Sequence, residues 1–323
     1  FFPNPQIGFV VGANGIILIT NDGGVTWTES PSGTTNSLRS VYFPETNIGY
    51  SVGDEGTIIK TTNGGSDWTV QTSGTQLDLW SVYFTSTSVG YTVGHHGLIL
   101  KTTDGGTNWL ECPIGTTDTL YSVFFTDENT GYTSGRFGVI LKTTDAGTSW
   151  AQVNYGSASY LFSIHFPDAN TGYASDTHGK VLKTNDAGLT WTVLETNADY
   201  TFHSLYFTDV NTGYVVGDRG TIMKTTCGGI ITGTPEFHSD ATKFHQFQVF
   251  PNPVNQHLTV LNSTNDAIEF TVTLIDMKGV KVMDQHYRHQ NRVSLDITSL
   301  NPGIYLVKVV TDKRTEVKKI VKQ

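Results

Sequence analysis

The sequence predicts an all-β protein: a β-propeller of four-stranded blades, followed by a small Ig-like β-sandwich. The chain has 323 residues with 34 glycines and only 15% charged residues, a composition that favours short strands and many turns over helices. A strand-and-turn pattern repeats at a fixed spacing through residues 1–232 and then stops. The remaining strands follow no repeat, which indicates a second domain.

The repeat has a period of 41 residues and is carried first by a glycine that precedes an aromatic residue. The six pairs are Gly8-Phe9, Gly49-Tyr50, Gly90-Tyr91, Gly131-Tyr132, Gly172-Tyr173 and Gly213-Tyr214. A tryptophan series that includes Trp68 and Trp109 keeps the same period, as does a lysine series that includes Lys60 and Lys101. Six copies in one register define the organisation of this region.

Each copy contains four short strands, as the third copy illustrates. Residues 79–84 alternate and are rich in aromatic and β-branched types, and strands at 91–93, at 98–102 and from about Trp109 follow after turns. Four antiparallel strands in 40–45 residues is the spacing of a propeller blade. A helical repeat would show 3.6-residue periodicity, and the coils of a β-solenoid are usually shorter than this repeat.

Blade number depends on the two ends of the repeat region. Phe2-Pro3 aligns with Phe43-Pro44, so the first copy begins at the end of its first strand, and the sixth copy stops after its third strand. Propellers normally close by completing one blade with strands from both termini. We therefore expect an upstream segment to supply the outer strand, and six visible blades or seven in the intact chain.

The turn before each tryptophan resembles the Asp-box, or bacterial neuraminidase repeat, with the pattern Ser/Thr-x-Asp-x-Gly-x-Thr-Trp. The residues that carry this structural motif are Asp22, Trp27, Asn63, Trp68, Asp104, Trp109, Asp145, Trp150, Asp186 and Trp191. A short carboxylate accepts backbone N–H bonds within its own turn, and glycine permits a positive φ. Asn63 can accept the same bonds, whereas the sixth copy has Cys227 and no tryptophan, so only the sixth box is expected to be lost.

The whole repeat is similar to propellers of the photosystem II assembly/stability-factor type. The similarity rests on phrases such as Asn-Thr-Gly-Tyr at 129–132 and Gly-x-Ile-x-Lys-Thr-Thr-Asp-Gly-Gly at 97–106. It extends over residues 1 to about 232. Photosynthetic members are a minority of the contexts in which this repeat occurs, so the resemblance implies a fold and not a photosynthetic role.

Residues 233–247 lack a strand pattern and are expected to form a linker, and residues 248–323 predict a β-sandwich. This last part resembles the C-terminal sorting domain of the type IX (Por) secretion system of Bacteroidota. The matching motifs include Pro251, Asn252, Pro253, Gly279, Gly303, Lys318 and Lys319. The resemblance implies recognition by the outer-membrane translocon, passage through the periplasm, and delivery of the protein to the cell surface or the medium.

Charge and hydropathy exclude several other classes of partner. Residues 1–240 carry a net charge of −13, which argues against binding to nucleic acid or to an anionic membrane. No run of about 18 apolar residues predicts a transmembrane helix. The chain has two cysteines, too few for a Cys-based zinc site, and the pattern assigns neither a metal nor a cofactor.

Two positions vary among the copies while the rest of the repeat stays uniform, and these are the candidate ligand-binding residues. The position near the start of each first strand holds Arg39, Trp80, Tyr121, Phe162 and His203. The turn between the second and third strands holds Asp54-Glu55, His95-His96, Arg136-Phe137, Thr177-His178 and Asp218-Arg219. Both positions should lie on one face, opposite the Asp boxes, where aromatic rings can stack on sugars or hold an extended peptide. In the competing interpretation, Trp80, Tyr121 and Phe162 only fill space between blades.

The sequence therefore favours a secreted, non-enzymatic propeller that binds a glycan or a protein, and it leaves two alternatives open. A sialidase needs three clustered arginines with a Tyr nucleophile, and this propeller has only Arg39, Arg136 and Arg219, none in the arginine motif of that family. A xyloglucanase-like glycoside hydrolase and a purely structural adhesin also fit the repeat. No catalytic residue is assigned. Metal binding by His95-His96 together with His178 is disfavoured because adjacent histidines on a turn point apart.

Overall fold

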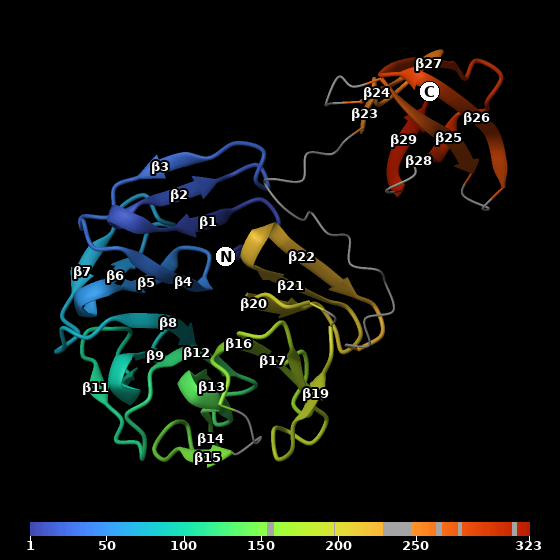
Figure 1. The fold of residues 1–323 in the computed structure, drawn as a ribbon. Helices are drawn as coiled ribbons and strands as arrows, with labels where there is room; N and C mark the ends of the chain where they lie inside the picture. The colour runs from blue at the N-terminus through green and yellow to red at the C-terminus, as the bar shows by residue number, and fades with distance from the viewer. Residues whose placement is uncertain (154–157, 197, 229–246, 263–266, 277–279, 312–314) are drawn as a thin grey trace. The chain divides into compact units, whose positions relative to one another are not determined.

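The computed structural model describes residues 1–153, 158–196, 198–228, 247–262, 267–276, 280–311 and 315–323. The chain divides into two compact units, Phe1–His238 and Ser239–Gln323 (Figure 1). Both units are built from antiparallel strands, as the sequence predicts. No helix among the described residues is long and apolar enough to span a membrane.

The first unit is a β-propeller of six sheets, which we number blade one to blade six in chain order. Blades two to five have four strands, whereas blades one and six have three each in the described residues. Blades one to three contain β1 (Gly8–Val11), β2 (Ile17–Thr20), β3 (Thr28–Ser30); β4 (Leu38–Glu45), β5 (Ile48–Gly53), β6 (Ile58–Thr61), β7 (Thr69–Gln71); β8 (Leu79–Phe84), β9 (Gly90–Gly94), β10 (Ile99–Thr102) and β11 (Leu110–Glu111). Blades four to six contain β12 (Leu120–Phe125), β13 (Gly131–Gly135), β14 (Ile140–Thr143), β15 (Ala151–Val153); β16 (Leu161–His165), β17 (Gly172–Asp176), β18 (Val181–Thr184), β19 (Thr192–Leu194); β20 (Phe202–Phe207), β21 (Gly213–Gly217) and β22 (Thr221–Thr225).

Neighbouring blades pack through their first strands, which line the centre of the propeller (Figure 1). The second and third strands of a blade, which correspond to β1 and β2 in blade one, are joined by one 3₁₀ turn in every blade except blade five. These turns are η1 (Ala13–Gly15), η2 (Asp54–Gly56), η3 (His95–Gly97), η4 (Arg136–Gly138) and η5 (Asp218–Gly220). The six-blade count and the four-stranded plan agree with the sequence prediction.

The recurring glycine–aromatic pair builds the interface between blades. A Cβ at Gly90 would lie 2.4 Å from the ring of Phe84, so glycine leaves room for the phenylalanine that ends the first strand of its own blade. Tyr50 of the preceding blade stacks on Phe84 with ring centroids 3.9 Å apart, and Trp109 meets the other side of Phe84 edge-on at 5.9 Å. The same three-ring arrangement recurs at each junction from blade two to blade five, and it forms the apolar core there.

A pair of polar side chains clamps each of these junctions to the Asp box of the next blade. The Tyr50 hydroxyl and the Lys60 ammonium both donate to the carbonyl oxygen of Gly105, at 2.9 and 2.7 Å. Tyr91 with Lys101, and Tyr132 with Lys142, donate in the same way to Ala146 and Ala187. The clamp requires both donors and the acceptor at fixed positions, and this explains why the tyrosine, lysine and Asp-box series share one period.

Within each Asp box the carboxylate ties its own turn, as the sequence predicts. The Oδ1 atom of Asp145 accepts from the backbone N–H of Ser149 at 2.9 Å, and Oδ2 accepts from the Ser149 hydroxyl at 2.6 Å. In blade two an amide takes the place of the carboxylate, and a carboxylate takes the place of its hydroxyl partner. Asn63 Oδ1 accepts from the Asp67 N–H, and Asn63 Nδ2 donates to the Asp67 carboxylate. The asparagine therefore preserves the turn. In the sixth box, the Cys227 N–H donates to the Thr225 hydroxyl at 3.4 Å, and the Cys227 thiol lies 3.7 Å from the same hydroxyl.

The second unit is a β-sandwich whose two sheets enclose one hydrophobic core. One sheet contains β23 (Phe247–Phe250), β24 (His257–Asn262) and β27 (Arg292–Asp296); the other contains β26 (Lys281–Gln290), β25 (Ile268–Asp276), β28 (Gly303–Val310) and β29 (Thr315–Lys322). Phe247 was expected to end the linker but is instead the first residue of β23, because its side chain is buried in this core. The other residues of the predicted linker, 233–246, lie outside the described part of the chain, as does Gly279.

The hydrogen bonds of the Asp boxes predict how stability responds to acid. Bonds from the Ser149 hydroxyl and N–H lower the pKa of Asp145 from 3.8 to about 2. Because the pKa is lower in the folded state, the stabilisation is present above pH 3.8 and is lost as the pH falls towards 2. We expect Asp145→Asn to reduce the loss of unfolding free energy between pH 5 and pH 2.5, measured by urea titration. Val70→Ala, which changes an exposed apolar side chain and no ionising group, should leave that loss unchanged, and an unaltered loss in Asp145→Asn would contradict the assignment.

Candidate functional site

The candidate residues near the start of each first strand all lie at β-bulges. In blade three Leu79 pairs with Gly94 and Ser81 pairs with Val93, so Trp80 is the additional residue between them. The same shift isolates Arg39, Tyr121, Phe162 and His203 in the other blades. A bulge turns one side chain away from the regular alternation of the strand, and bulges are common beside binding sites. The variable position of the first strands is therefore a bulged, unpaired position in each of these five blades.

The other candidate series lies in the 3₁₀ turns, where one non-glycine residue per turn has a left-handed backbone. These residues are Asn14 (φ 58°), Glu55 (φ 55°), His96 (φ 56°), Phe137 (φ 54°) and Arg219 (φ 58°). Asparagine adopts this conformation readily, but for a bulky residue it is strained. Phe137 is moreover exposed. Four of the five turns thus hold a larger side chain than the backbone favours.

The two series lie at the same end of the blades, and the Asp boxes lie at the opposite end. In blade two Leu38 pairs with Gly53 beside the turn, whereas Gly49 pairs with Thr61 at the Asp box. The Arg39 guanidinium accordingly reaches Asp54, donating at 2.7 and 3.1 Å. In blade six, His203 Nε2 lies 2.7 Å from the Asp218 carboxylate. The strand register therefore places both candidate series on one face of the propeller, as the sequence predicts.

The bulge side chains touch one another from blade to blade and form a continuous row, which we call the mouth row: Arg39, Trp80, Tyr121, Phe162 and His203. The Arg39 guanidinium lies 4.6 Å from the Trp80 ring centroid. The Trp80 and Tyr121 rings are 5.4 Å apart, and Tyr121 and Phe162 are 4.9 Å apart. His203 completes the row, 5.4 Å from Phe162. These contacts fill part of the space between blades, as the packing interpretation expected, yet every member of the row stays at least partly exposed.

Around the mouth row, the arginines and histidines make separate local contacts. Arg136 stacks on Phe137 and donates to the Tyr160 hydroxyl at 3.2 Å, and the Arg219 guanidinium lies 4.4 Å from the Tyr200 ring centroid. His95 lies 3.5 Å from the Asp78 carboxylate and packs against Trp80. The arginines are held by different blades with different partners, so they do not form the cluster that a sialidase needs. Among the described residues no group of three metal-ligating side chains occurs.

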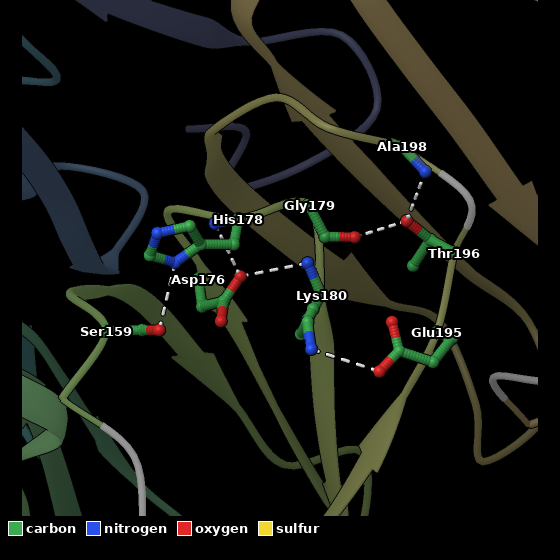
Figure 2. A network of polar contacts seen from close by, with 8 residues as sticks. All are labelled: Ser159, Asp176, His178, Gly179, Lys180, Glu195, Thr196 and Ala198. Carbon is green, nitrogen blue, oxygen red and sulfur yellow. Dashed lines mark hydrogen bonds and ion pairs between the residues drawn. The ribbon is translucent and has the colours of Figure 1, made fainter.

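The turn of blade five departs from the others, and Figure 2 shows its polar network. Ser159, His178 and Asp176 come together there, but not as a catalytic triad. The Ser159 hydroxyl lies 3.0 Å from His178 Nδ1, whereas the buried Asp176 carboxylate accepts the backbone N–H groups of His178 and Lys180 at 2.8 and 2.9 Å. Since the carboxylate holds the backbone and not the imidazole, this network orders the turn.

A second aromatic row, which sequence reasoning missed, runs along the first strands below the mouth row. This channel row contains Phe1, Tyr42, Tyr83, Phe124, His165 and Tyr206, with ring centroids of neighbours 4.8–5.2 Å apart. A ring-bearing residue directly before the recurring phenylalanine of each first strand was a visible signal. At the Asp-box end, Tyr42 and Tyr83 border a hollow of about 300 Å³ with Asp127 and Glu128. Together, the mouth row and the channel row line the centre of the propeller with aromatic side chains.

The motif residues of the second unit also come together, although they are almost 70 positions apart. Asn252 Nδ2 donates to the Lys319 carbonyl oxygen at 3.0 Å, and Asn252 Oδ1 accepts the Val321 N–H at 2.9 Å. The neighbouring Val254 bonds the backbone of Val321 and Gln323. The Pro251–Pro253 segment therefore lies along the outer edge of β29, the strand that carries Lys318 and Lys319.

Comparisons with known proteins agree with both parts of this description. Residues 248–323 match the family model of the secretion system C-terminal sorting domain, and residues 1–78, 33–111 and 69–159 match that of the photosynthesis system II assembly factor YCF48. Both resemblances drawn from the sequence are confirmed. No curated protein was found to match the chain.

Several solved structures share the fold. YCF48 bound to D1 peptide is 18% identical with a TM-score of 0.59, covering 81% of this chain and 86% of that one. PorZ, an essential surface component of the type IX secretion system of Porphyromonas gingivalis, is 13% identical with a TM-score of 0.53; the match covers 99% of this chain but only 50% of PorZ. The GH74 enzyme of Niastella koreensis is 14% identical with a TM-score of 0.59, covering 98% and 64%. At these identities the likenesses show the β-propeller fold alone.

The channel row predicts a second, separate response to pH. Burial lowers the pKa of His165 from 6.5 to about 4, because the charged imidazolium is poorly solvated there. The unfolded chain therefore binds this proton first, and stability falls as the pH drops from 6.5 towards 4. We expect His165→Phe, which repeats Phe124, to remove much of the stability difference between pH 7 and pH 4.5 in urea unfolding. His96→Asn, at an exposed turn, is the control that should not; equal pH dependence in His165→Phe and wild type would refute the interpretation.

Proposed function

We propose that this chain, a β-propeller of YCF48-like repeats joined to a type IX sorting domain, is exported and binds a glycan or protein ligand on its mouth face. The sorting domain indicates export to the cell surface or the medium. The observation that carries the binding proposal is the mouth row: the repeat keeps its core nearly constant and varies a bulged, partly exposed residue five times in succession. Exposed aromatic rings with adjacent hydrogen-bonding groups suit sugar rings or an extended peptide.

The structural neighbours support a binding or scaffold role without naming the ligand. PorZ is a surface component of the type IX system, and one YCF48 structure contains a bound peptide. The GH74 neighbours keep a glycoside hydrolase as the alternative function. A hydrolase of this kind needs two carboxyl groups about 5–9.5 Å apart across the scissile bond. On the mouth face, however, Asp54 and Asp218 are engaged by Arg39 and His203, which disfavours their use as a catalytic pair.

Substitutions in the mouth row should weaken ligand binding much more than they lower stability. After a ligand is found on a glycan and peptide array, we expect Trp80→Ala and Tyr121→Ala to weaken binding at least tenfold in titrations. Their melting should change less than that of a core variant, because both side chains are already partly exposed and their ring contacts are worth about 1 kcal/mol apiece. Trp109→Ala in the Asp box is the matched control: its buried ring should cost about 3–5 kcal/mol. If Trp80→Ala destabilises the chain as much as Trp109→Ala, the row is core and the proposal fails. Turnover of an arrayed glycan would favour the hydrolase.

Export should depend on the hydrogen bonds between the Pro251–Pro253 segment and β29. Deletion of residues 248–323 should retain a folded propeller in the periplasm of a Bacteroidota host. Asn252→Ala should reduce surface delivery severalfold, because it removes both side-chain bonds to the last strand. Asn255→Ala, an exposed asparagine of the same segment, is the control. Fractionation and surface labelling measure the outcome, and normal delivery of the truncated chain would overturn the proposal.

A further inference from the structure

The end of the propeller that carries the Asp boxes has a hollow of its own, opposite the mouth face. This Asp-box hollow has a volume of about 300 Å³ and is bordered by the ends of the first strands of blades two, three and four. Tyr42 and Tyr83 of the channel row lie in its wall, and Asp127 and Glu128 belong to the loop that follows β12. Sites for small ligands begin at about this volume, which is also enough for one long side chain of a partner.

Glu128 is the residue at which the fourth copy of the repeat departs from the others in this loop. The equivalent position is uncharged in the five other copies, where it holds Pro5, Thr46, Thr87, Ala169 and Val210. The Glu128 side chain is exposed, and it makes no hydrogen bond or ion pair with any residue that the structure describes. One blade alone therefore places a free carboxylate at the edge of the hollow.

The loop that carries Glu128 is shaped by its neighbour Asp127. The Oδ1 atom of Asp127 accepts the backbone N–H groups of Asn129 and Thr130 at 2.7 and 2.8 Å. The N–H of Ala146 in the Asp box donates to the Asn129 carbonyl oxygen at 2.9 Å, which ties the loop to the outer part of blade four. Glu128 is therefore not needed to form the loop, and its backbone is held in place beside the hollow.

Three of the hydroxyl donors in the wall are used within the protein. The Tyr83 hydroxyl donates to the Phe125 carbonyl oxygen at 3.0 Å. The Thr85 and Thr126 hydroxyls donate to carbonyl oxygens of their own loops at 3.5 and 3.3 Å. The ten residues that border the hollow include two carboxylates and no lysine, arginine or histidine. Because a carboxylate only accepts hydrogen bonds, a ligand that complements this wall must bring the donors.

Charges near the hollow have the same sign as its wall. Hydrogen bonds from Asn108 lower the pKa of Asp104 to about 2, and the pKa of Asp145 in the next Asp box is also about 2. Both carboxylates are therefore ionised at neutral pH. Lys60, a lysine of the polar clamp at this end, donates to a carbonyl oxygen of the next blade and does not border the hollow. A concave site lined by one sign of charge attracts ligands of the other sign.

We propose that the Asp-box hollow binds one basic side chain, a lysine or an arginine, on an extended segment of a partner polypeptide. The cationic head brings the donors that the wall lacks, and Asp127 and Glu128 supply the opposite charge. Tyr42 and Tyr83, with ring centroids 4.8 Å apart, add aromatic surface for the cation and its aliphatic stem. The stem also lets the head enter while the partner backbone stays outside. This site lies at the opposite end from the mouth row, so it does not depend on the ligand proposed there.

Titration of the full chain with short peptides tests the site. The probes have the sequence Gly-Ser-Gly-X-Gly-Ser-Gly with blocked ends, where X is arginine, lysine, citrulline or glutamate. At low salt we expect the arginine and lysine peptides to bind about fivefold or more tightly than the other two, and to shift the ring resonances of Tyr42 and Tyr83. Citrulline keeps the shape of arginine without its charge, so equal binding of the arginine and citrulline peptides would overturn the proposal.

Matched charge-removing variants locate the binding. Glu128→Gln should weaken binding of the arginine peptide about threefold or more, with an unchanged melting temperature, because its carboxylate makes no contact in the fold. Glu111→Gln removes one exposed carboxylate from the outer strand of blade three and should leave binding unchanged. Equal effects of the two variants would show a general charge effect and would contradict the site. A calcium titration gives the other decisive outcome: if calcium ions shift the tyrosine resonances and neither basic peptide does, the hollow is a metal site and the proposal fails.

Discussion

The propeller depends on one junction that is used repeatedly: a tyrosine and a lysine of one blade hold a carbonyl in the Asp-box turn of the next. The carbonyl of Gly105 accepts both donors, so the turn that presents it must have one shape. The Asp104 carboxylate fixes that shape through its bonds to Asn108. A change of period by one residue would separate donors and acceptor at two junctions at once. Uniform spacing is therefore a consequence of the interface, and not only a trace of duplication.

This constraint leaves few positions free to vary, and the free positions have a common physical character. Trp80 lies at a bulge, where no ladder partner depends on its identity. Phe137 lies at the tip of a turn, outside the core. Neither side chain takes part in the stacked rings or the polar clamp. Variation at these two positions changes the mouth face while it leaves the junctions intact, which is the arrangement expected of a scaffold that recognises ligands.

The features predictable from the sequence are those that repeat, and the missed ones depend on long-range contacts or on a single copy. The Asp boxes, including the substitution Asn63, followed from local hydrogen-bonding capacity. The buried state of Phe247 did not, because it depends on strands far away in the sequence. The role of Asn252 on β29 needed a pairing over almost 70 positions. The exchange of glycine for Asp176 in blade five was visible in the alignment, but its bonds to the backbone were not.

The turn tips connect stability with function most directly. Asn14 shows that the turn accepts the residue best suited to a left-handed backbone. Glu55, His96 and Phe137 occupy the same backbone conformation at a cost of about 1 kcal/mol or more each. The turn is closed by backbone bonds that any residue can make, so these side chains are not needed to form it. Phe137 contacts Arg136 and Tyr160 and is nevertheless half exposed, on the same face as the mouth row. The strain at the tips and the variation at the bulges are two independent features that support the proposed binding face.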